Sequence, residues 1–349
     1  MKKSEDIIMT KDEIIIRNAI IHILDSSVGM PVLSEQLLPQ SQDLYDLIRG
    51  HIFRIASGDD LKHCVFDTGE TEEERVVYQL LQNFEEENLI SFSQEIASYL
   101  YTIMNENIDI PAADFLVVTY QVNSTPHMAM LKLNYKDSFV HMTGKDEDGS
   151  HFNDIIKQTA TLPSAGARLS EAVLIDLSDF SVDIVEKKYE VNGIKTNYLS
   201  EMFLKCHAKM SQKTKMNIVT KAVDQINKKY FEDDFDKKME AKSIIQNEIA
   251  ESGTIQVETI SEKIYGDLPE VKEEFTEKLE KYHMADARIV PQSETTTKKF
   301  TKQFIKTDTG IEINIPMEQY NDKDNVEFIT NPDGTISIMI KNINHITTR

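Results

Sequence analysis

Residues 114–135 read DFLVVTYQV, NSTP and HMAMLKLNY in succession. The two outer runs are rich in valine, leucine, tyrosine and methionine, as expected of two strands in a sheet with buried faces. The four residues between them, 123–126, are turn formers. The pattern therefore predicts an antiparallel β-hairpin with a four-residue loop.

Strands and helices are predicted on both sides of this hairpin. Residues 14–24 are rich in isoleucine with polar residues interspersed, which indicates a strand with one wet face. Residues 41–55 carry leucine and isoleucine every three or four positions, which indicates an amphipathic helix, and a capping box predicts another helix from Thr71. A third helix is predicted over 91–104. Further strands are predicted around 139–143, 152–159, 169–177 and 182–188.

Because these strands follow one another without crossover helices, we predict an α+β fold: an antiparallel sheet with helices on one face, not a doubly wound sheet. From 198 to 230 the pattern becomes helical, with a break near Ser211, and more short helices follow. The last segment is strand-like again over 311–315, 326–330 and 336–343. We predict three parts: an α+β N-terminal domain over 1–190, a helical region with a basic window over 191–285, and a small β-rich C-terminal segment over 286–349.

The composition indicates a folded and acidic protein. The chain has 349 residues, with 38 Lys and Arg against 59 Asp and Glu, which gives a net charge of −21. Its 40% hydrophobic content is enough for a core, and its length suits two or three domains. No apolar run approaches the roughly 18–20 residues of a membrane helix, and the first residues run into charge without a signal-peptide core. We therefore expect a soluble cytoplasmic protein with no membrane partner.

One stretch departs from this acidity. Residues 187–229 contain ten lysines against three acidic residues, a local charge of +7 that leaves −28 on the rest of the chain. In the predicted helix, Lys205, Lys209 and Lys213 recur every four residues beside an apolar arc that includes Cys206. Two interpretations stay open: an ordinary solvated helix face, or an anion-binding surface.

A smaller basic cluster lies near the C-terminus. Lys298, Lys299 and Lys302 are interleaved with Phe300 and Phe304. Such a cluster suits either phosphate binding beside an aromatic platform or an edge strand whose lysines discourage aggregation.

Enzyme motifs and metal motifs are weak throughout. Gly144-Lys145 lacks the upstream glycine of a phosphate-binding loop, and residues 146–149 fail as a calcium loop and instead predict a hairpin turn. Cys64 and Cys206 lie far apart without paired spacing, so we expect small buried hydrophobes, with no disulfide or zinc site. The segment 257–282 has helix-turn-helix proportions, but its second helix is too acidic to face phosphates. We expect no cofactor, no metal and no catalytic residues, and a thiol-dependent or nuclease-like enzyme is the minor alternative.

The order of several stretches resembles the bacterial nucleoid-associated protein family over nearly the whole chain. The stretches are the strand 14–24, the hairpin 114–135, the run VLID at 173–176 that leads through 183–185 to YLSEMFLKC at 198–206, and the tail TGIEINI at 309–315. The resemblance implies a cytoplasmic protein that localises to the nucleoid and associates with chromosomal DNA without catalysis. The family provides no catalytic residues to carry over.

Two functional hypotheses follow. In the first, the chain is a non-enzymatic nucleoid-associated protein that contacts DNA phosphates without strong sequence specificity. The candidate DNA-binding residues are Lys205, Lys209, Lys213, Lys215, Lys221, Lys298, Lys299 and Lys302. In the second, it is an acidic adaptor that reaches the nucleoid through a DNA-bound partner such as a topoisomerase.

Self-association is a further expectation. Ile218, Val219, Ala222, Val223 and Ile226 form an apolar stripe at helical spacing. The stripe can pack within the chain or against a second copy. A homodimer is predicted because it would bring two basic windows together and engage more phosphates.

Overall fold

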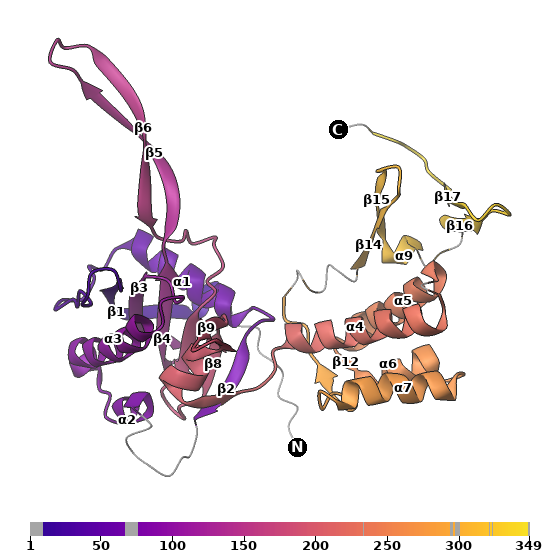
Figure 1. The fold of residues 1–349 in the computed structure, drawn as a ribbon, viewed down its shortest axis with the longest axis horizontal. Coiled ribbons are helices and arrows are strands. Elements are labelled where there is room, and N and C mark those ends of the chain that lie inside the picture. Colours follow the sequence, from indigo (N-terminus) through magenta and orange to yellow (C-terminus); the bar gives the residue numbers. More distant parts are fainter. Residues whose placement is uncertain are drawn as a thin grey trace. The chain divides into compact units, whose positions relative to one another are not determined.

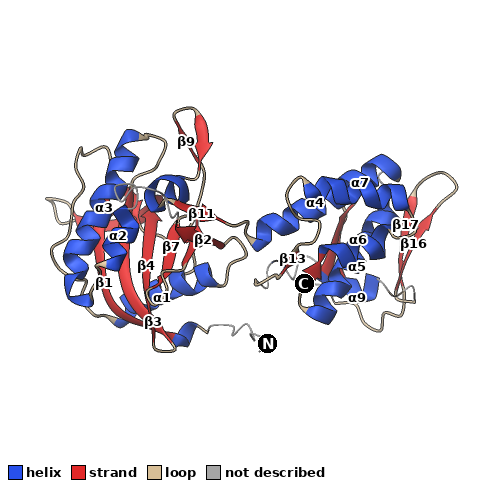
Figure 2. Ribbon diagram, turned by 90° about the horizontal axis from the view of Figure 1, so that it is seen from below, coloured by secondary structure: helices blue, strands red, loops and turns tan. Residues whose placement is uncertain are grey.

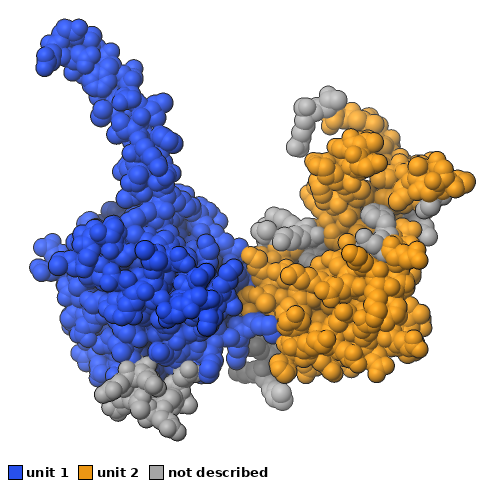
Figure 3. Space-filling model, in the orientation of Figure 1, with its two compact units in different colours: residues 1–210 blue, residues 211–349 orange. Residues whose placement is uncertain are grey.

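The computed structural model describes residues 10–66, 76–232, 234–293, 296, 301–320, 322 and 324–347. The chain forms two compact units, residues 1–210 (unit 1) and 211–349 (unit 2) (Figure 3). Unit 1 extends beyond residue 190, where the sequence places the end of the first domain, because residues 206–208 complete its sheet.

Unit 1 is built on a seven-stranded sheet in which every neighbouring pair is antiparallel (Figure 2). The order is β1-β3-β4-β7-β8-β2-β11. The strands are β1 (Ile14–Leu24), β2 (Lys62–Phe66), β3 (Ala113–Val122), β4 (Thr125–Asn134), β7 (Ala172–Asp176), β8 (Val182–Val185) and β11 (Cys206–Ala208). The predicted α+β class is confirmed, while β2 and β11 were not predicted.

The central hairpin has a two-residue loop, not the predicted four. Asn123 and Ser124 have φ values of 49° and 69°, and Thr125 already pairs with Val122. Positive φ at both loop residues is typical of the type I′ turn, whose twist matches that of the flanking strands. Asparagine tolerates this conformation, so Thr125 and Pro126 are free to join β4.

Helices cover both faces of the sheet, so the prediction of helices on one face is wrong. The helices of unit 1 are α1 (Gln42–Ala56), α2 (Val76–Gln82) and α3 (Leu89–Glu106), with a π-helical turn η4 (Leu199–Leu204). Ile52 of α1 shares one core with Val118, whereas Ile96 of α3 shares the other with Val117. Both faces of β3 are therefore buried, which explains its continuous apolar sequence. The capping box predicted from Thr71 lies outside the described residues.

A long two-stranded ribbon projects from unit 1 (Figure 1). It consists of β5 (Lys136–Lys145) and β6 (His151–Thr161), joined by the predicted turn. A Cβ atom at Gly144 would lie 2.5 Å from the ring of Phe152, so the ring lies directly over the glycine. An aromatic ring placed over a glycine in this way supports a strand that lacks a side chain there. A short hairpin, β9 (Tyr189–Val191) and β10 (Ile194–Thr196), follows β8 in the sequence.

A buried ion pair lies inside unit 1. Lys132 of β4 is 2% exposed and Glu171 is fully buried, with 3.4 Å between Nζ and Oε2. Asn134 donates to the same carboxylate oxygen at 2.6 Å and Tyr189 at 2.9 Å, while Tyr198 donates to Oε1. Burial lowers the pKa of Lys132, and Glu171 partly restores it. These bonds join β4, β9 and the start of η4 to one carboxylate.

The basic window does not form the predicted helical face. After η4, Lys205 adopts a left-handed conformation with φ of 51°, and the chain then enters β11. The next helix begins only after Ser211, so Lys205 and Lys209 do not share a helix with Lys213. Pairing of β11 with β2, far away in sequence, overrides the helical spacing.

The two cysteines are neighbours, contrary to their sequence separation. Cys206 lies on β11, not on a helical arc, and Cys64 lies on the adjacent β2. Both thiols are buried and free, as expected of small hydrophobes. The pKa of Cys64 is raised far above its ordinary value. The larger cause is the hydrogen bond with Cys206, and the next is burial.

Unit 2 is a helical core followed by small hairpins. The helices are α4 (Gln212–Tyr230), α5 (Phe235–Ser252), α6 (Val257–Tyr265) and α7 (Pro269–Glu280), with a short pair of β12 (Ile255–Gln256) and β13 (Arg288–Ile289). The C-terminal elements are β14 (Lys302–Lys306), β15 (Glu312–Pro316), α9 (Met317–Tyr320), β16 (Val326–Thr330) and β17 (Ile336–Ile340). Val219, Val223 and Ile226 are buried in the core of this unit, so the apolar stripe packs within the chain.

We expect Lys132→Met to destabilise unit 1 by about 3–5 kcal/mol, because it leaves Glu171 as an uncompensated buried charge. Urea unfolding followed by circular dichroism measures the loss, and hydrogen exchange of the β4 amides assigns it to unit 1. Adding Glu171→Gln should recover part of the stability. A single variant as stable as the wild type would contradict a charged pair at this position.

Both thiols should react slowly with a thiol reagent in the native protein at neutral pH, because they are buried and Cys64 stays protonated. Cys206→Ala should cost about 1 kcal/mol of packing energy and leave the fold intact. Mass spectrometry of timed labelling gives the rates. Modification as fast as that of the urea-unfolded chain would show that β2 and β11 separate readily.

Candidate nucleic-acid interface

Helix α4 presents the main basic surface of unit 2. The side chain of Ser211 caps its N-terminus by accepting a hydrogen bond from the Thr214 amide at 3.2 Å. Met216 and Val223 lie on its buried side. Lys213, Lys221 and Lys228 are exposed, and none of the three makes an ion pair with another residue in the part of the chain that the structure describes.

The geometry of α4 places these lysines within an arc of about 80° around the helix. Lys221 and Lys228 are separated by seven residues, about two helical turns, and so point in nearly the same direction. Lys213 lies eight residues before Lys221. At about 1.5 Å per residue, the three charges span ~22 Å of helix. We name them the α4 lysines.

The other basic residues of α4 are placed differently. Lys215 is half-buried on the flank of the helix. Lys229 forms an ion pair with Glu274, which also accepts a hydrogen bond from Tyr230 at 2.5 Å. The bond from Lys229, with that from Tyr230, lowers the pKa of Glu274 to about 2. Lys229 is therefore already neutralised.

The remaining predicted residues that the structure describes belong to different units. In unit 1, Lys205 is half-buried, and the backbone amide of Lys209 donates to the carbonyl of His63 at 2.8 Å. In unit 2, Lys302 is exposed on β14. Lys298 and Lys299 lie outside the described residues.

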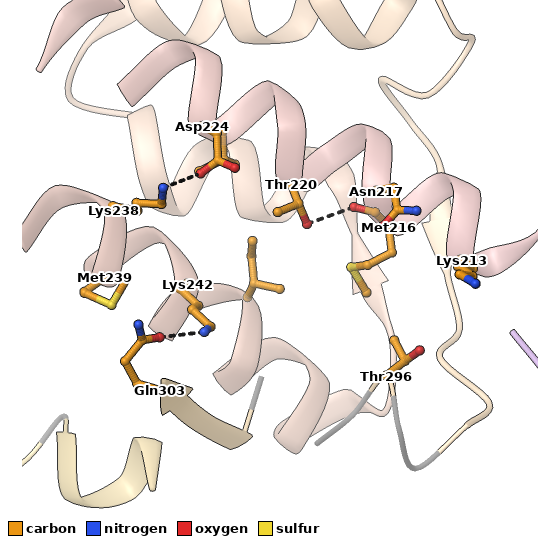
Figure 4. A pocket seen from close by; sticks show the side chains of 12 residues that line it. Lys213, Met216, Asn217, Thr220, Asp224, Lys238, Met239, Lys242, Thr296 and Gln303 are labelled. Carbon is orange, nitrogen blue, oxygen red and sulfur yellow. Dashed lines mark hydrogen bonds and ion pairs between the residues drawn. The ribbon is translucent and has the colours of Figure 1, made fainter. Parts of the chain in front are cut away.

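A cavity of about 360 Å³ lies beside α4 within unit 2 (Figure 4). Its apolar lining comes from Met216, Val223, Met239 and Ile245. Three lysines reach it, Lys213 from α4 and both Lys238 and Lys242 from α5. Thr296 and Gln303 also line it, so it joins α4 to the segment that carries the second basic cluster.

The three lysines of this cavity have different partners. Lys238 Nζ lies 3.1 Å from Asp224 Oδ1, so those two charges balance. Lys242 Nζ donates to Gln303 Oε1 at 2.6 Å, and Gln303 is neutral and buried. Burial, followed by the nearby charge of Lys238, lowers the pKa of Lys242. Lys242 is thus a half-buried cation with an uncharged partner.

Sequence reasoning did not single out Lys242 or Gln303. Lys242 is followed at helical spacing by Ile245 and Ile249, both buried. The sequence signal for Lys242 is therefore the position of a lysine on the apolar side of an amphipathic helix. Gln303 alternates with exposed neighbours on β14 and is indistinguishable in sequence from an ordinary strand residue.

Net charge differs between the units. Unit 1 contains 18 Lys and Arg against 34 Asp and Glu, a net charge of −16, whereas unit 2 contains 20 against 25, a net charge of −5. Helix α4 itself carries five lysines and one aspartate. Anion binding is thus favoured locally on α4 in a chain that is acidic as a whole.

The described residues contain neither a metal site nor a membrane-spanning helix. Across them, no group of three His, Cys, Asp or Glu side chains is arranged to hold a metal ion. In the same residues, no helix is both long and apolar enough to cross a membrane. The buried Glu171 contacts lie outside the lining of the α4 cavity.

A protein-family model described as nucleoid-associated protein YejK matches residues 20–346. The match spans both units and confirms the resemblance seen in the sequence. No curated protein matches the chain.

Proposed function

Since the chain belongs to the nucleoid-associated protein YejK family, we propose that unit 2 associates with chromosomal DNA through the α4 lysines. The contacts are to phosphates and carry little sequence preference. The observation that supports this is the exposure of Lys213, Lys221 and Lys228 along one helix without carboxylate partners among the described residues. The role requires no catalysis.

Free cations matter because binding gains from the release of counterions when a lysine neutralises a phosphate. Lys229 contributes less, since Glu274 already pairs with it. Lys215 and Lys302 flank the surface as further candidates. Lys205 and Lys209 of unit 1, and Lys298 and Lys299, which lie outside the described residues, also remain candidates.

A second candidate is the adaptor. Unit 1 carries a net charge of −16 and suits docking on a basic DNA-handling protein such as a topoisomerase. Nucleoid association is then indirect. The two candidates differ in one measurement, the binding of DNA by the purified protein alone.

We expect the wild type to bind a labelled DNA duplex with log affinity falling against log salt at a slope of about −3, because three lysines are engaged. The triple variant Lys213→Glu, Lys221→Glu and Lys228→Glu should abolish this binding at low salt. Fluorescence anisotropy measures both, and an unrelated duplex should compete equally.

The matched control places the same three charge reversals at Lys263, Lys281 and Lys306, on α6, after α7 and on β14. This control has the same net charge as the α4 triple variant but leaves the α4 lysines intact. It should therefore retain most of the affinity for DNA. Equal loss in both variants would assign the effect to net charge alone. No binding by the wild type at about 20 mM salt would contradict direct contact and favour the adaptor.

We also propose that the chain forms a homodimer, through the β5–β6 ribbon. Directly paired residues on an antiparallel ribbon share a face, and Val140 pairs with Ile156. Met142 and Phe152 lie on the same face, which therefore carries four apolar side chains together with one acid, Asp154, the partner of Met142. Val140, Met142 and Ile156 are exposed. An isolated two-stranded ribbon is marginal in water, so a covering partner would stabilise it.

The charge pattern of the ribbon favours a second copy as that partner. The base of the ribbon has two lysines and one acid, a net charge of +1 in which Asp137 pairs with Lys157 at 2.6 Å, and its tip has one lysine and three acids, a net charge of −2. The base residues are Lys136, Lys157 and Asp137, and the tip residues are Lys145, Asp146, Glu147 and Asp148. Two ribbons packed antiparallel place each acidic tip beside a basic base.

Light scattering should return twice the 40.0 kDa chain mass for the wild type in the micromolar range. Val140→Asp with Ile156→Asp should give the monomer, because the pair buries two charges in the apolar face. The matched control, Thr143→Asp with Asn153→Asp, is the pair on the opposite face and should stay dimeric. A monomeric wild type, or dimers in both variants, would refute the ribbon interface.

A further inference from the structure

We propose that the cavity between α4 and α5 binds a small organic anion, in which one phosphate or carboxylate is joined to an apolar, planar body. The cavity lies wholly within unit 2, and about 360 Å³ is within the usual size range of small-molecule sites. This binding goes beyond DNA association, because it centres on Lys242 of α5, which is not one of the α4 lysines. Lys213 alone belongs both to the exposed α4 lysines and to the cavity lining.

Lys242 is the residue from which we infer that the ligand carries an anionic group. Its ammonium group is half-buried and donates to the amide oxygen of Gln303 at 2.6 Å. Among the residues that the structure describes, the one carboxylate in the lining, Asp224, is already paired with Lys238. A partly desolvated cation without a counter-charge is costly, so a ligand anion beside Lys242 would be stabilised by a charge-assisted hydrogen bond.

The lysines on either side strengthen the preference for an anion. Lys213 and Lys238 also line the cavity, so the described part of its lining carries three cations and one acid. Burial lowers the pKa of Lys242, and a bound anion would raise it again. Two protons of the Lys242 ammonium remain available beyond its bond to Gln303.

The apolar residues of the lining are the reason to infer that the ligand also has an apolar body. Met216, Val223, Met239 and Ile245 provide the hydrophobic part of the cavity wall. Methionine side chains adapt to flat ligands because they are unbranched and polarisable. Inorganic phosphate alone would leave this wall in contact with water, which is why the proposal specifies a body as well as an anion.

The probe is 1-naphthyl phosphate, which has one phosphate on a planar apolar body. Its two controls are 1-naphthol, which lacks the anion, and inorganic phosphate, which lacks the body. In the full chain with methyl-labelled methionine, NMR should show saturable shifts of Met216 and Met239. Met128 and Met130, in the core of unit 1, should not move. Met216→Leu and Met239→Leu assign the two signals.

Lys242→Met keeps the aliphatic stem and removes the charge, and it should weaken 1-naphthyl phosphate by about tenfold or more. Lys237→Met, on the same helix but outside the cavity lining, is the matched control and should bind as the wild type does. Circular dichroism confirms that both variants fold. Neither variant alters an α4 lysine, so DNA binding should persist in both and the two proposals fail independently.

Three results would overturn the inference. The first is a titration in which Met216 and Met239 do not shift. The second is equal affinity for 1-naphthyl phosphate and either control compound, which would remove the need for the anion or for the body. The third is unchanged affinity in a folded Lys242→Met protein.

Discussion

One buried carboxylate holds together much of unit 1. Glu171 accepts hydrogen bonds from Asn134 and Tyr189, and it lies beside the ammonium group of Lys132 inside the sheet. Its other oxygen accepts from Tyr198, which directly precedes η4. A buried ion pair adds little stability over a well-packed apolar pair, but it is strongly specific, because a register shift in β4 would leave a charge unpaired. Through Tyr189 and Tyr198, the network also contacts the segment that leads toward β11.

The distribution of charge is the second constraint on function. An acidic chain approaches DNA only where cations are concentrated and free, and unit 2 meets both conditions on α4. Ion pairs within the protein decide which lysines are available to neutralise phosphates. Lys229 and Lys238 are held by Glu274 and Asp224, whereas Lys221 and Lys228 face solvent. A count of lysines in the sequence gives all of them equal weight.

Lysines of unit 2 therefore fall into two kinds with different chemistry. Exposed lysines such as Lys221 are hydrated, and their proposed contacts with phosphates act at long range and are screened by salt. Lys242 is half-buried and lines a cavity with methionine and isoleucine side chains, where screening is weaker and the proposed anion would be held by direct contact. The two proposals together combine weak, extended DNA contact with recognition of a small molecule.

Local sequence patterns determined the strands of the hairpin 114–135, the ribbon and most helices, because alternation and helical periodicity act over a few residues. They also placed the lysines of α4 on a helix. Tertiary structure alone decided the rest. Lys205 leaves the helical path because β11 pairs with β2, and Cys64 meets Cys206 for the same reason. Lys242 meets Gln303 across about sixty residues. Such contacts depend on packing between residues far apart in sequence, and periodicity over a few residues cannot predict it.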